Sequence, residues 1–267
     1  MKISILTPSY NQGQFIEQTI RSVLSQSDPD FEHLVIDGGS TDETVEILKK
    51  HPHLQWVSEK DGGQSDALRK GLGMSHGEII GWINSDDYYD TGAFAAVREV
   101  FEDPSVLWVV GNLSYVFDES GDVVPDKSRR PTHAALVQNP DILRQQPTFF
   151  RRRLLEQVGG WNPKYHMTMD YDLWTRMARV VDPAFIDQNL AFFRFHRGQK
   201  TTAKNVETQA RELAEIMTRE GASTHEVANL VRRKRTMLRK LKVKEFLIRV
   251  GLIPSRYGSQ PLRTRKR

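Results

Sequence analysis

The amino-acid sequence predicts an α/β fold with a mostly parallel central sheet flanked by helices. Short apolar stretches rich in β-branched residues alternate with segments whose apolar residues recur at helical spacing, and this alternation repeats before residue 90. Polar clusters follow directly after the predicted strands. Because ligands of open α/β sheets bind beyond the carboxyl ends of the strands, this pattern also predicts where the site lies.

The first part of the chain supplies four predicted strands, at residues 3–7, 34–36, 54–57 and 78–83. Helices are predicted between them, over residues 14–25, around residues 45–48 and over residues 64–74. Pro8 is expected to end the first strand, because the residue before a proline is held in an extended conformation and a loop follows. Ser40 or Thr41 is expected to cap the second helix.

The second part is predicted to be less regular. A helix begins near Thr91, and a hairpin joins residues 115–117 to residues 123–124. The Gly159-Gly160 pair is expected to end a helix that follows residues 145–150. Further predicted elements are a strand at residues 107–110, a strand near residues 192–195, helices over residues 205–220 and 224–250, and a C-terminal tail at residues 251–267.

Composition narrows the functional classes. No stretch reaches the ~18–20 apolar residues of a membrane span, and the N-terminus lacks the pattern of a signal peptide. The chain has no cysteine, which excludes disulfides and thiolate chemistry and favours the cytosol. The glycine-rich loops that bind dinucleotides or the phosphates of ATP are absent after the first strand, so nicotinamide cofactors and ATP-driven phosphoryl transfer are not expected.

Charge is distributed unevenly. Residues 223–267 carry 14 Lys and Arg against 2 Glu, a net charge of +12. The remaining 222 residues carry 24 basic against 32 acidic residues, a net charge of −8. A basic C-terminal segment on an acidic body predicts an anionic partner, such as a membrane surface, rather than a particular fold.

The central feature of the sequence is the run Asn84, Ser85, Asp86 and Asp87, which follows the fourth strand. Two adjacent carboxylates repel each other unless a cation lies near them. Mg²⁺ prefers one or two carboxylates together with substrate phosphates, which this run can offer. The alternative is an acidic turn that merely caps the next helix.

Three more polar clusters follow predicted strands, at residues 7–11, 37–42 and 61–64. Parallel strands would bring these three and residues 84–87 to one edge of the sheet, which makes a ligand site more probable than any single cluster does.

These motifs identify a resemblance. The runs Thr-Pro-Ser-Tyr-Asn at residues 7–11, Asp-Gly-Gly-Ser-Thr-Asp at residues 37–42 and Asn-Ser-Asp-Asp at residues 84–87 resemble a family 2 glycosyltransferase of the GT-A fold. The similarity extends from about Lys2 to His196. It implies an inverting transferase that uses a nucleotide diphosphate sugar, expected to be UDP-linked, and a divalent metal ion, Mn²⁺ or Mg²⁺.

The resemblance also implies site residues. Those expected to bind the nucleotide sugar are Thr7, Pro8, Tyr10, Asn11, Asp37, Asp66, Asn84 and Asp86. Asp87 and His196 are expected to bind the metal. Asp170 corresponds to the catalytic base, although a capping role is the alternative. Residues expected on the acceptor side are Gln146, Trp161, Asp172 and Trp174, with Asp172 also suited to the first turn of a helix.

The chain departs from the family pattern at several positions. Gly38 and Asn84 stand where an acidic residue is common, and the first of these leaves the nucleobase open. Met169 replaces the usual Glu before Asp170, and Leu68 replaces an Arg.

The predicted organisation is a glycosyltransferase domain over residues 1–200 and a helical, basic extension over residues 201–267. Within the domain, residues 1–110 are expected to bind the donor and residues 111–200 the acceptor. The predicted reaction moves one sugar onto a hydroxyl of a glycan or lipid-linked glycan in cell-surface polysaccharide synthesis, on the inner face of the cell membrane. The alternatives are a sugar nucleotidyltransferase and a protein that binds nucleic acid through its basic tail. Nucleic acid is not an expected partner, since few aromatic residues accompany those charges.

Overall fold

The computed structural model describes residues 1–27, 30–128, 131–196, 199 and 205–249, with side chains of the last helix described as far as Lys240. The chain forms two compact units. The first contains residues 1–114 and 125–193, and the second contains residues 115–124 and the described residues from 194 onward. The tail predicted at residues 251–267 lies outside the described residues.

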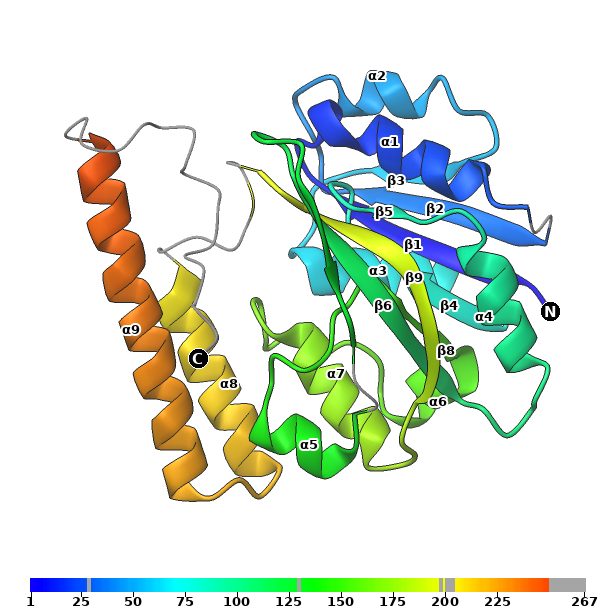
Figure 1. The fold of residues 1–267 in the computed structure, drawn as a ribbon. Coiled ribbons are helices and arrows are strands. Elements are labelled where there is room, and N and C mark those ends of the chain that lie inside the picture. Colours follow the sequence, from blue (N-terminus) through cyan, green and yellow to red (C-terminus); the bar gives the residue numbers. More distant parts are fainter. Residues whose placement is uncertain (28–29, 129–130, 197–198, 200–204, 250–267) are drawn as a thin grey trace. The chain divides into compact units, whose positions relative to one another are not determined.

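The strands form one sheet in the order β3, β2, β1, β4, β8, β6, β9 and β5, with β7 beside β6 (Figure 1). The parallel part consists of β1 (Ile3–Ser9), β2 (Phe31–Asp37), β3 (Gln55–Ser58) and β4 (Ile79–Trp82). The other strands are β5 (Tyr88–Tyr89), β6 (Trp108–Phe117), β7 (Val123–Asp126), β8 (Thr148–Arg151) and β9 (Ala184–Phe195). β8 runs antiparallel to β4 and β6, and β5 runs antiparallel to β9. The sheet is therefore parallel where the sequence alternates between strand and helix, and mixed beyond β4.

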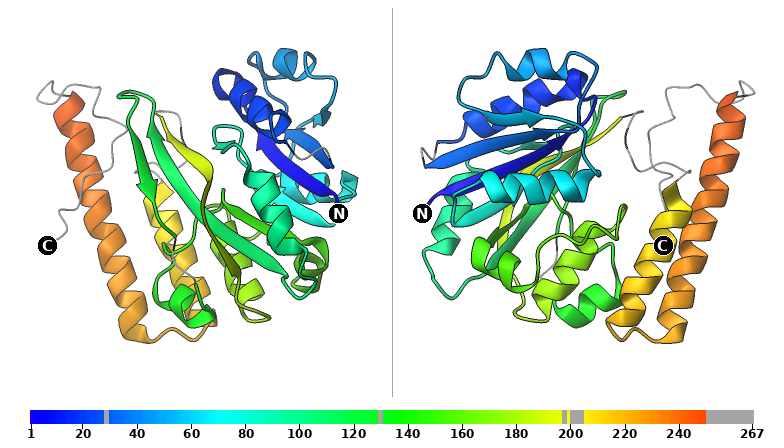
Figure 2. Two further views of the ribbon diagram at one scale, coloured as in Figure 1. Left: turned by 45° about the vertical axis from the view of Figure 1, so that its right-hand side comes forward. Right: turned by 180° about the vertical axis from the view of Figure 1, so that it is seen from behind.

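Helices cover both faces of the parallel strands. Figure 2 shows α1 and α2 on one side of these strands and α3 on the other. The helices of the first unit are α1 (Gly13–Leu24), α2 (Thr44–Leu48), α3 (Gln64–Met74), α4 (Ala93–Phe101), α5 (His133–Gln138), α6 (Arg152–Gln157) and α7 (Met169–Ala178). This layering follows from β1, β2 and β4, which are buried on both faces and need a cover on each.

The alternation of side chains along β1 shows how the two faces are used. Ile5 belongs to the buried cluster that includes Val23 of α1 and Phe94 of α4. Its neighbour Leu6 points the other way, toward α3. There, Gly71 lets the helix approach so closely that a methyl group on it would lie 2.5 Å from the Cδ1 atom of Ile36. Close helix–sheet packing at Gly71 therefore fixes the position of α3, whose first turn reaches the site.

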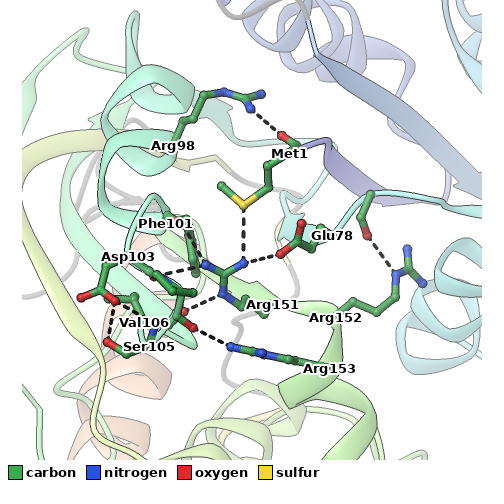
Figure 3. Close-up of polar contacts among 12 residues, drawn as sticks. Met1, Glu78, Arg98, Phe101, Asp103, Ser105, Val106, Arg151, Arg152 and Arg153 are labelled. Atoms are coloured by element: carbon green, nitrogen blue, oxygen red, sulfur yellow. Dashed lines mark hydrogen bonds and ion pairs between the residues drawn. The ribbon is translucent and has the colours of Figure 1, made fainter.

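Arg151, at the end of β8, ties the strand to the loops around it (Figure 3). Its side chain is buried, and its guanidinium donates to the carbonyl oxygens of Phe101 and Val106, both at 2.8 Å. It also contacts the carboxylate of Glu78, just before β4. A buried guanidinium is tolerated only when its N–H groups are paired, and these contacts meet that requirement. Arg151 therefore fastens β8 beside β4.

The second unit contains a helical hairpin formed by α8 (Val206–Arg219) and α9 (Thr224–Arg249). The two helices are separated by Gly221, whose φ of +89° favours glycine. On α9, Leu230, Lys234 and Leu238 are buried at intervals of four residues, while the basic side chains between them are exposed. Leu230 and Leu238 are therefore covered, whereas Leu241 and Leu247, further leucines of the same helix, lie outside the residues whose side chains are described.

Two local predictions were wrong. β1 continues through Pro8 to Ser9 instead of ending before the proline. Pairing with β4 stops at Leu6, so Pro8 has only β2 beside it, and its missing N–H interrupts no ladder. At α2 neither Ser40 nor Thr41 is the cap: Glu43 holds the N-cap position without a side-chain bond, and Asp42 accepts the N–H of Thr44 at 3.0 Å.

Candidate active site

The loops after β1 and β2 hold each other. The backbone N–H of Asn11 donates to the hydroxyl of Ser40 at 2.7 Å, and the Asn11 side-chain oxygen accepts the N–H of Thr41 at 2.9 Å. Asn11 has a φ of +52°, a conformation that asparagine tolerates better than most residues. Tyr10 is consequently turned outward, with 61% of its surface exposed. A planar side chain exposed at the edge of the sheet is available to stack on a base.

The carboxylate of Asp37 holds the loop after β2 through hydrogen bonds beneath it. Its carboxylate is fully buried and accepts the N–H of Ser40 at 2.8 Å and the hydroxyl of Ser58 at 2.6 Å. The Ser40 hydroxyl also donates to it. These bonds join the loops after β2 and β3, so Asp37 shapes the loop edge from within.

Thr7 and Pro8, the two other residues expected at the nucleotide, are also buried. The hydroxyl of Thr7 lies 2.9 Å from Nε2 of His33 on β2. Burial lowers the pKa of His33 from 6.5 to about 3, and the nearby imidazoles of His53 and His51 add to this effect. His33 is therefore neutral at physiological pH, and it is part of the buried core beneath the loops.

The third loop leads into α3. Gly63 has a φ of +104°, and its N–H donates to Asp61 at 2.8 Å. The carboxylate of Asp66, half-buried in the first turn of α3, accepts the N–H of Gly62 at 3.1 Å. Asp66 thus folds back on its own loop and fixes the start of the helix.

Asn84, at the end of β4, connects four parts of the site. Its side-chain oxygen accepts Nε2 of Gln64 at 2.7 Å and the indole N–H of Trp82 at 3.0 Å. Its amide nitrogen donates to Oε1 of Gln145 at 3.1 Å and to Oδ2 of Asp87 at 3.3 Å. The start of α3, the end of β4, the carboxylate of Asp87 and the segment before β8 therefore meet at one side chain.

The two adjacent carboxylates have different surroundings. Asp87 is 1% exposed, and its Oδ2 atom also accepts Nε2 of Gln146 at 2.7 Å. Asp86 is half-buried. The backbone of the turn is held from α1, where the hydroxyl of Thr19 lies 2.6 Å from the carbonyl oxygen of Asp87 and 2.9 Å from that of Ser85. Hydrogen bonds from other segments therefore fix this turn within the fold. Asp86 is the more accessible of its two carboxylates.

Asp170 lies in the first turn of α7 and is half-buried. Its Oδ1 atom accepts the N–H of Tyr171 at 2.8 Å. The preceding residue, Met169, is buried and accepts the hydroxyl of Ser65 in the first turn of α3. The structure therefore brings Asp170 to the helix whose first turn also reaches Asn84.

Three of the residues expected on the acceptor side are buried in the structure. Trp161 is 1% exposed and packs edge-to-face on Trp82, whereas Trp174 is 2% exposed and stacks on Trp108. Asp172 is fully buried and pairs with Arg176 through two contacts of 2.6 and 3.0 Å. The two tryptophans lie among other aromatic rings and Asp172 is held by Arg176, so all three support the site from within the core. Gln146, the fourth, is buried against Asp87, as described above.

His196 belongs to the second unit, where it is buried and its N–H donates to Oε1 of Gln199 at 3.3 Å. Among the residues that the structure describes, no group of three or more His, Cys, Asp or Glu side chains is placed to hold a metal ion. Asp86 and Asp87 supply two carboxylates, which suits Mg²⁺ or Mn²⁺ only if phosphate oxygens complete the shell.

Sequence reasoning missed several residues of this site: Thr19, Gln64, Gln145 and Ser65. Each acts through a contact between segments far apart in the chain. A polar side chain gives no local sign of such a partner, whether it lies in a helix, as Thr19, Gln64 and Ser65 do, or before a strand, as Gln145 does. The doubled glutamine at residues 145–146, placed before an apolar stretch, was the one available signal.

Comparisons with known proteins agree with this architecture. The family model described as glycosyl transferase family 2 matches residues 4–174. The chain is 25% identical over 211 residues to a chondroitin synthase of Escherichia coli, which covers 78% of this chain and 31% of the relative. It is 24% identical over 211 residues to a hyaluronan synthase of Pasteurella multocida, covering 78% of this chain and 22% of the relative. The chain thus spans less than a third of the length of these relatives.

Two solved structures share the fold. TarS of S. aureus, residues 1–349 in complex with UDP-GlcNAc, has a TM-score of 0.64 at 17% identity over 86% of this chain and 70% of that one. A mannosyltransferase of Pyrobaculum calidifontis, in complex with GDP-Man and Mn²⁺, has a TM-score of 0.61 at 20% identity over 89% of this chain and 69% of that one. The α/β fold expected from the resemblance is confirmed. Because the family model covers more than half of the residues, and includes the loops and the acidic turn described above, the chain belongs to glycosyl transferase family 2.

Proposed function

We propose that this protein transfers a sugar from a nucleotide diphosphate sugar to a hydroxyl of a glycan acceptor, with inversion at the anomeric carbon. The observation that carries the proposal is the acidic turn at residues 84–87, held in place at the carboxyl end of β4 by α1, α3 and the segment before β8. This is the edge of an α/β sheet at which ligands bind. Family membership adds the reaction class.

The donor would lie across the loops after β1 and β2. Tyr10 offers an exposed ring for the base, and the interlocked loops at Asn11 and Ser40 offer backbone groups for the ribose. Structures with the same fold contain UDP-GlcNAc in one case and GDP-Man in another. Gly38 stands where an acidic residue is common in the family, so this position leaves the nucleobase open. We therefore propose a UDP-linked donor on the resemblance alone.

A divalent ion fits the donor set of the acidic turn. Asp86, the more accessible carboxylate, would hold it together with Asp87, and the diphosphate would supply the remaining oxygens. When bound, Mn²⁺ or Mg²⁺ would stabilise the negative charge of the leaving diphosphate. The mannosyltransferase with this fold was solved with Mn²⁺.

Asp170 would act on the acceptor. An acceptor hydroxyl is a weak nucleophile, and a carboxylate that accepts its proton accelerates attack on the anomeric carbon by ~10²–10⁴-fold. Asp170 is half-buried in the first turn of α7, so its carboxylate is both accessible and held by the N–H of Tyr171.

The acceptor proposed is a growing cell-surface glycan, free or attached to lipid, because two relatives are named as chondroitin and hyaluronan synthases. We also propose an anionic membrane surface as a partner of the second unit. In the described part of the chain, no helix is both long and apolar enough to cross a membrane. The basic side chains exposed on α9 would instead contact the surface through charge.

The proposed function is tested by melting the protein with a panel of nucleotide diphosphates and their sugars, each with Mn²⁺ and with a chelator. A ligand at ~100 times its dissociation constant adds ~2.7 kcal/mol to the free energy of unfolding. The preferred donor should raise the melting temperature when Mn²⁺ is present, and less in chelator. Release of the nucleotide diphosphate from that donor in the presence of oligosaccharide acceptors then tests transfer. If no nucleotide or nucleotide sugar shifts the melting temperature, the donor site is refuted.

A further inference from the structure

The amide of Asn84 uses its full hydrogen-bonding capacity inside the protein. An asparagine side chain can donate two hydrogen bonds and accept two. Asn84 accepts from Gln64 and Trp82, and it donates to Gln145 and Asp87. These four partners leave the side chain no further bond to offer a donor sugar or ribose, although that was the role expected of it from the resemblance.

The bond from Asn84 to Asp87 matters because the Asp87 carboxylate is almost fully buried. A buried carboxylate is costly unless N–H donors or a cation compensate it. Oδ2 of Asp87 accepts one N–H from Asn84 at 3.3 Å and one from Gln146 at 2.7 Å. Two neutral amides thus provide what a cation would otherwise have to supply to this oxygen.

A carboxylate at position 84 could not donate a hydrogen bond to Asp87. It would keep the bonds from Gln64 and Trp82, because those need only an acceptor. It would lose both donated bonds and place a second negative charge about 3.3 Å from Asp87. The same turn would then depend on a cation to hold it together.

We propose that Asn84 is the positioning residue of the acidic turn: it fixes the Asp87 carboxylate by an amide hydrogen bond, so that the turn is fully built before metal or donor binds. The role in positioning rests on the proposed function, since it concerns the same site. The hydrogen bond itself can be tested without any transfer activity.

The first experiment melts the full-length protein in chelator, with neither donor nor acceptor. Asn84→Asp, which keeps size and shape, should lower the melting temperature by about 4–10 °C, as expected when a buried acceptor loses its donor and gains a like charge. The matched control is Asn162→Asp, because the bond found for Asn162 is accepted by its oxygen, from the N–H of Lys164, and Asp keeps that acceptor. The double variant Asn84→Asp, Asp87→Asn removes the second charge and should recover part of the loss.

The second experiment separates positioning from direct contact. If the proposed transfer is observed, Asn84→Asp should lower kcat by up to ~10²-fold, as a displaced catalytic group does, while the donor KM changes by less than about threefold. Three results would each overturn the proposal: an unchanged melting temperature for Asn84→Asp, a double variant no more stable than Asn84→Asp, or a raised donor KM with normal kcat. Melting requires no substrate, so a failure of the proposed function leaves that part of the test intact.

Discussion

The hydroxyl of Ser65 donates to the sulfur of Met169 across 3.3 Å, which joins the first turn of α3 to the first turn of α7. Asp170 follows Met169, and Gln64 precedes Ser65 and bonds to Asn84. The proposed base and the acidic turn are therefore linked through two helix starts. The sequence has Met at position 169 where the family pattern has Glu, and the structure gives this residue a buried, packing role.

Asp170→Asn keeps the shape of the carboxylate and can still accept the N–H of Tyr171, but it cannot accept a proton from the acceptor. Turnover should fall by ~10²–10⁴-fold. Donor affinity, measured by the shift in melting temperature, should stay within about twofold. The control is Asp122→Asn in an exposed turn, which should leave turnover unchanged. Turnover within about threefold of the unmodified protein would remove Asp170 from the mechanism.

Asp172 and Arg176 form an ion pair with a structural role, in contrast to the catalytic role proposed for Asp170. Asp172 is fully buried, and the guanidinium of Arg176 also donates to the carbonyl oxygen of Gly160 at 2.8 Å. Asp172→Ala should cost roughly 3–5 kcal/mol of unfolding free energy, because it leaves a largely buried guanidinium without its partner. Glu46→Ala, which breaks the exposed pair with Lys49, should leave the free energy of unfolding nearly unchanged.

Urea unfolding of both variants measures these costs. An Asp172→Ala protein that unfolds like the unmodified chain but binds acceptor less well would instead support the role in acceptor binding that the sequence suggested.

Local pattern predicted the parallel part of the sheet and the loops that follow its strands. α3 begins and ends where the spacing of apolar residues placed it, at Gln64 and Met74. Runs of β-branched residues and glycine-rich turns are local signals, and they sufficed there. The same signals located the acidic turn, because it lies between an apolar strand and a helix.

The remaining features depend on contacts across the chain. The sequence predicts residues 145–150 as the approach to a helix, because the short run Thr-Phe-Phe-Arg of β8 carries no clear period. Its place beside β4 is fixed by pairing with a strand some seventy residues away. Trp161 and Trp174 are expected on the acceptor side from the resemblance, and their burial by tertiary packing could not be predicted from their local sequence. The engagement of Asn84 with Gln145 could not be read from either local segment.

The buried His33 predicts a dependence of stability on pH. Its pKa is lowered to about 3 in the folded protein, whereas an unfolded histidine titrates near 6.5, so between these values only the unfolded chain takes up the proton. Stability therefore falls as the pH drops below about 6.5, by up to about 1.4 kcal/mol per pH unit. His33→Gln, which can still bond to Thr7, should flatten the acid side of a plot of melting temperature against pH. His225→Gln, at an exposed position, should not. Parallel curves for all three proteins would contradict this account.

The exposed basic side chains of α9 predict binding to anionic membranes. They are Arg232, Arg233, Arg235, Arg239 and Lys240, all exposed within nine residues. Each Lys or Arg near an anionic surface contributes about 1 kcal/mol, so the group can hold the protein there. Leu230 and Leu238 of the same helix are buried, which leaves charge rather than insertion as the expected mode.

Co-sedimentation with vesicles tests this mode. The protein should pellet with vesicles containing about 30% phosphatidylglycerol and not with pure phosphatidylcholine. Raising the salt from about 0.1 to about 0.5 M should release it, because screening shortens the reach of the charges.

Replacing Arg232, Arg233 and Arg235 with Gln should weaken binding by ~10²-fold, if each charge contributes about 1 kcal/mol. The same replacement at Lys49, Lys50 and Lys164, which are exposed on the first unit, removes an equal charge and should have little effect. Salt-resistant binding would point to insertion of apolar side chains, and equal binding of both triple variants would show that net charge, and not α9, attracts the protein.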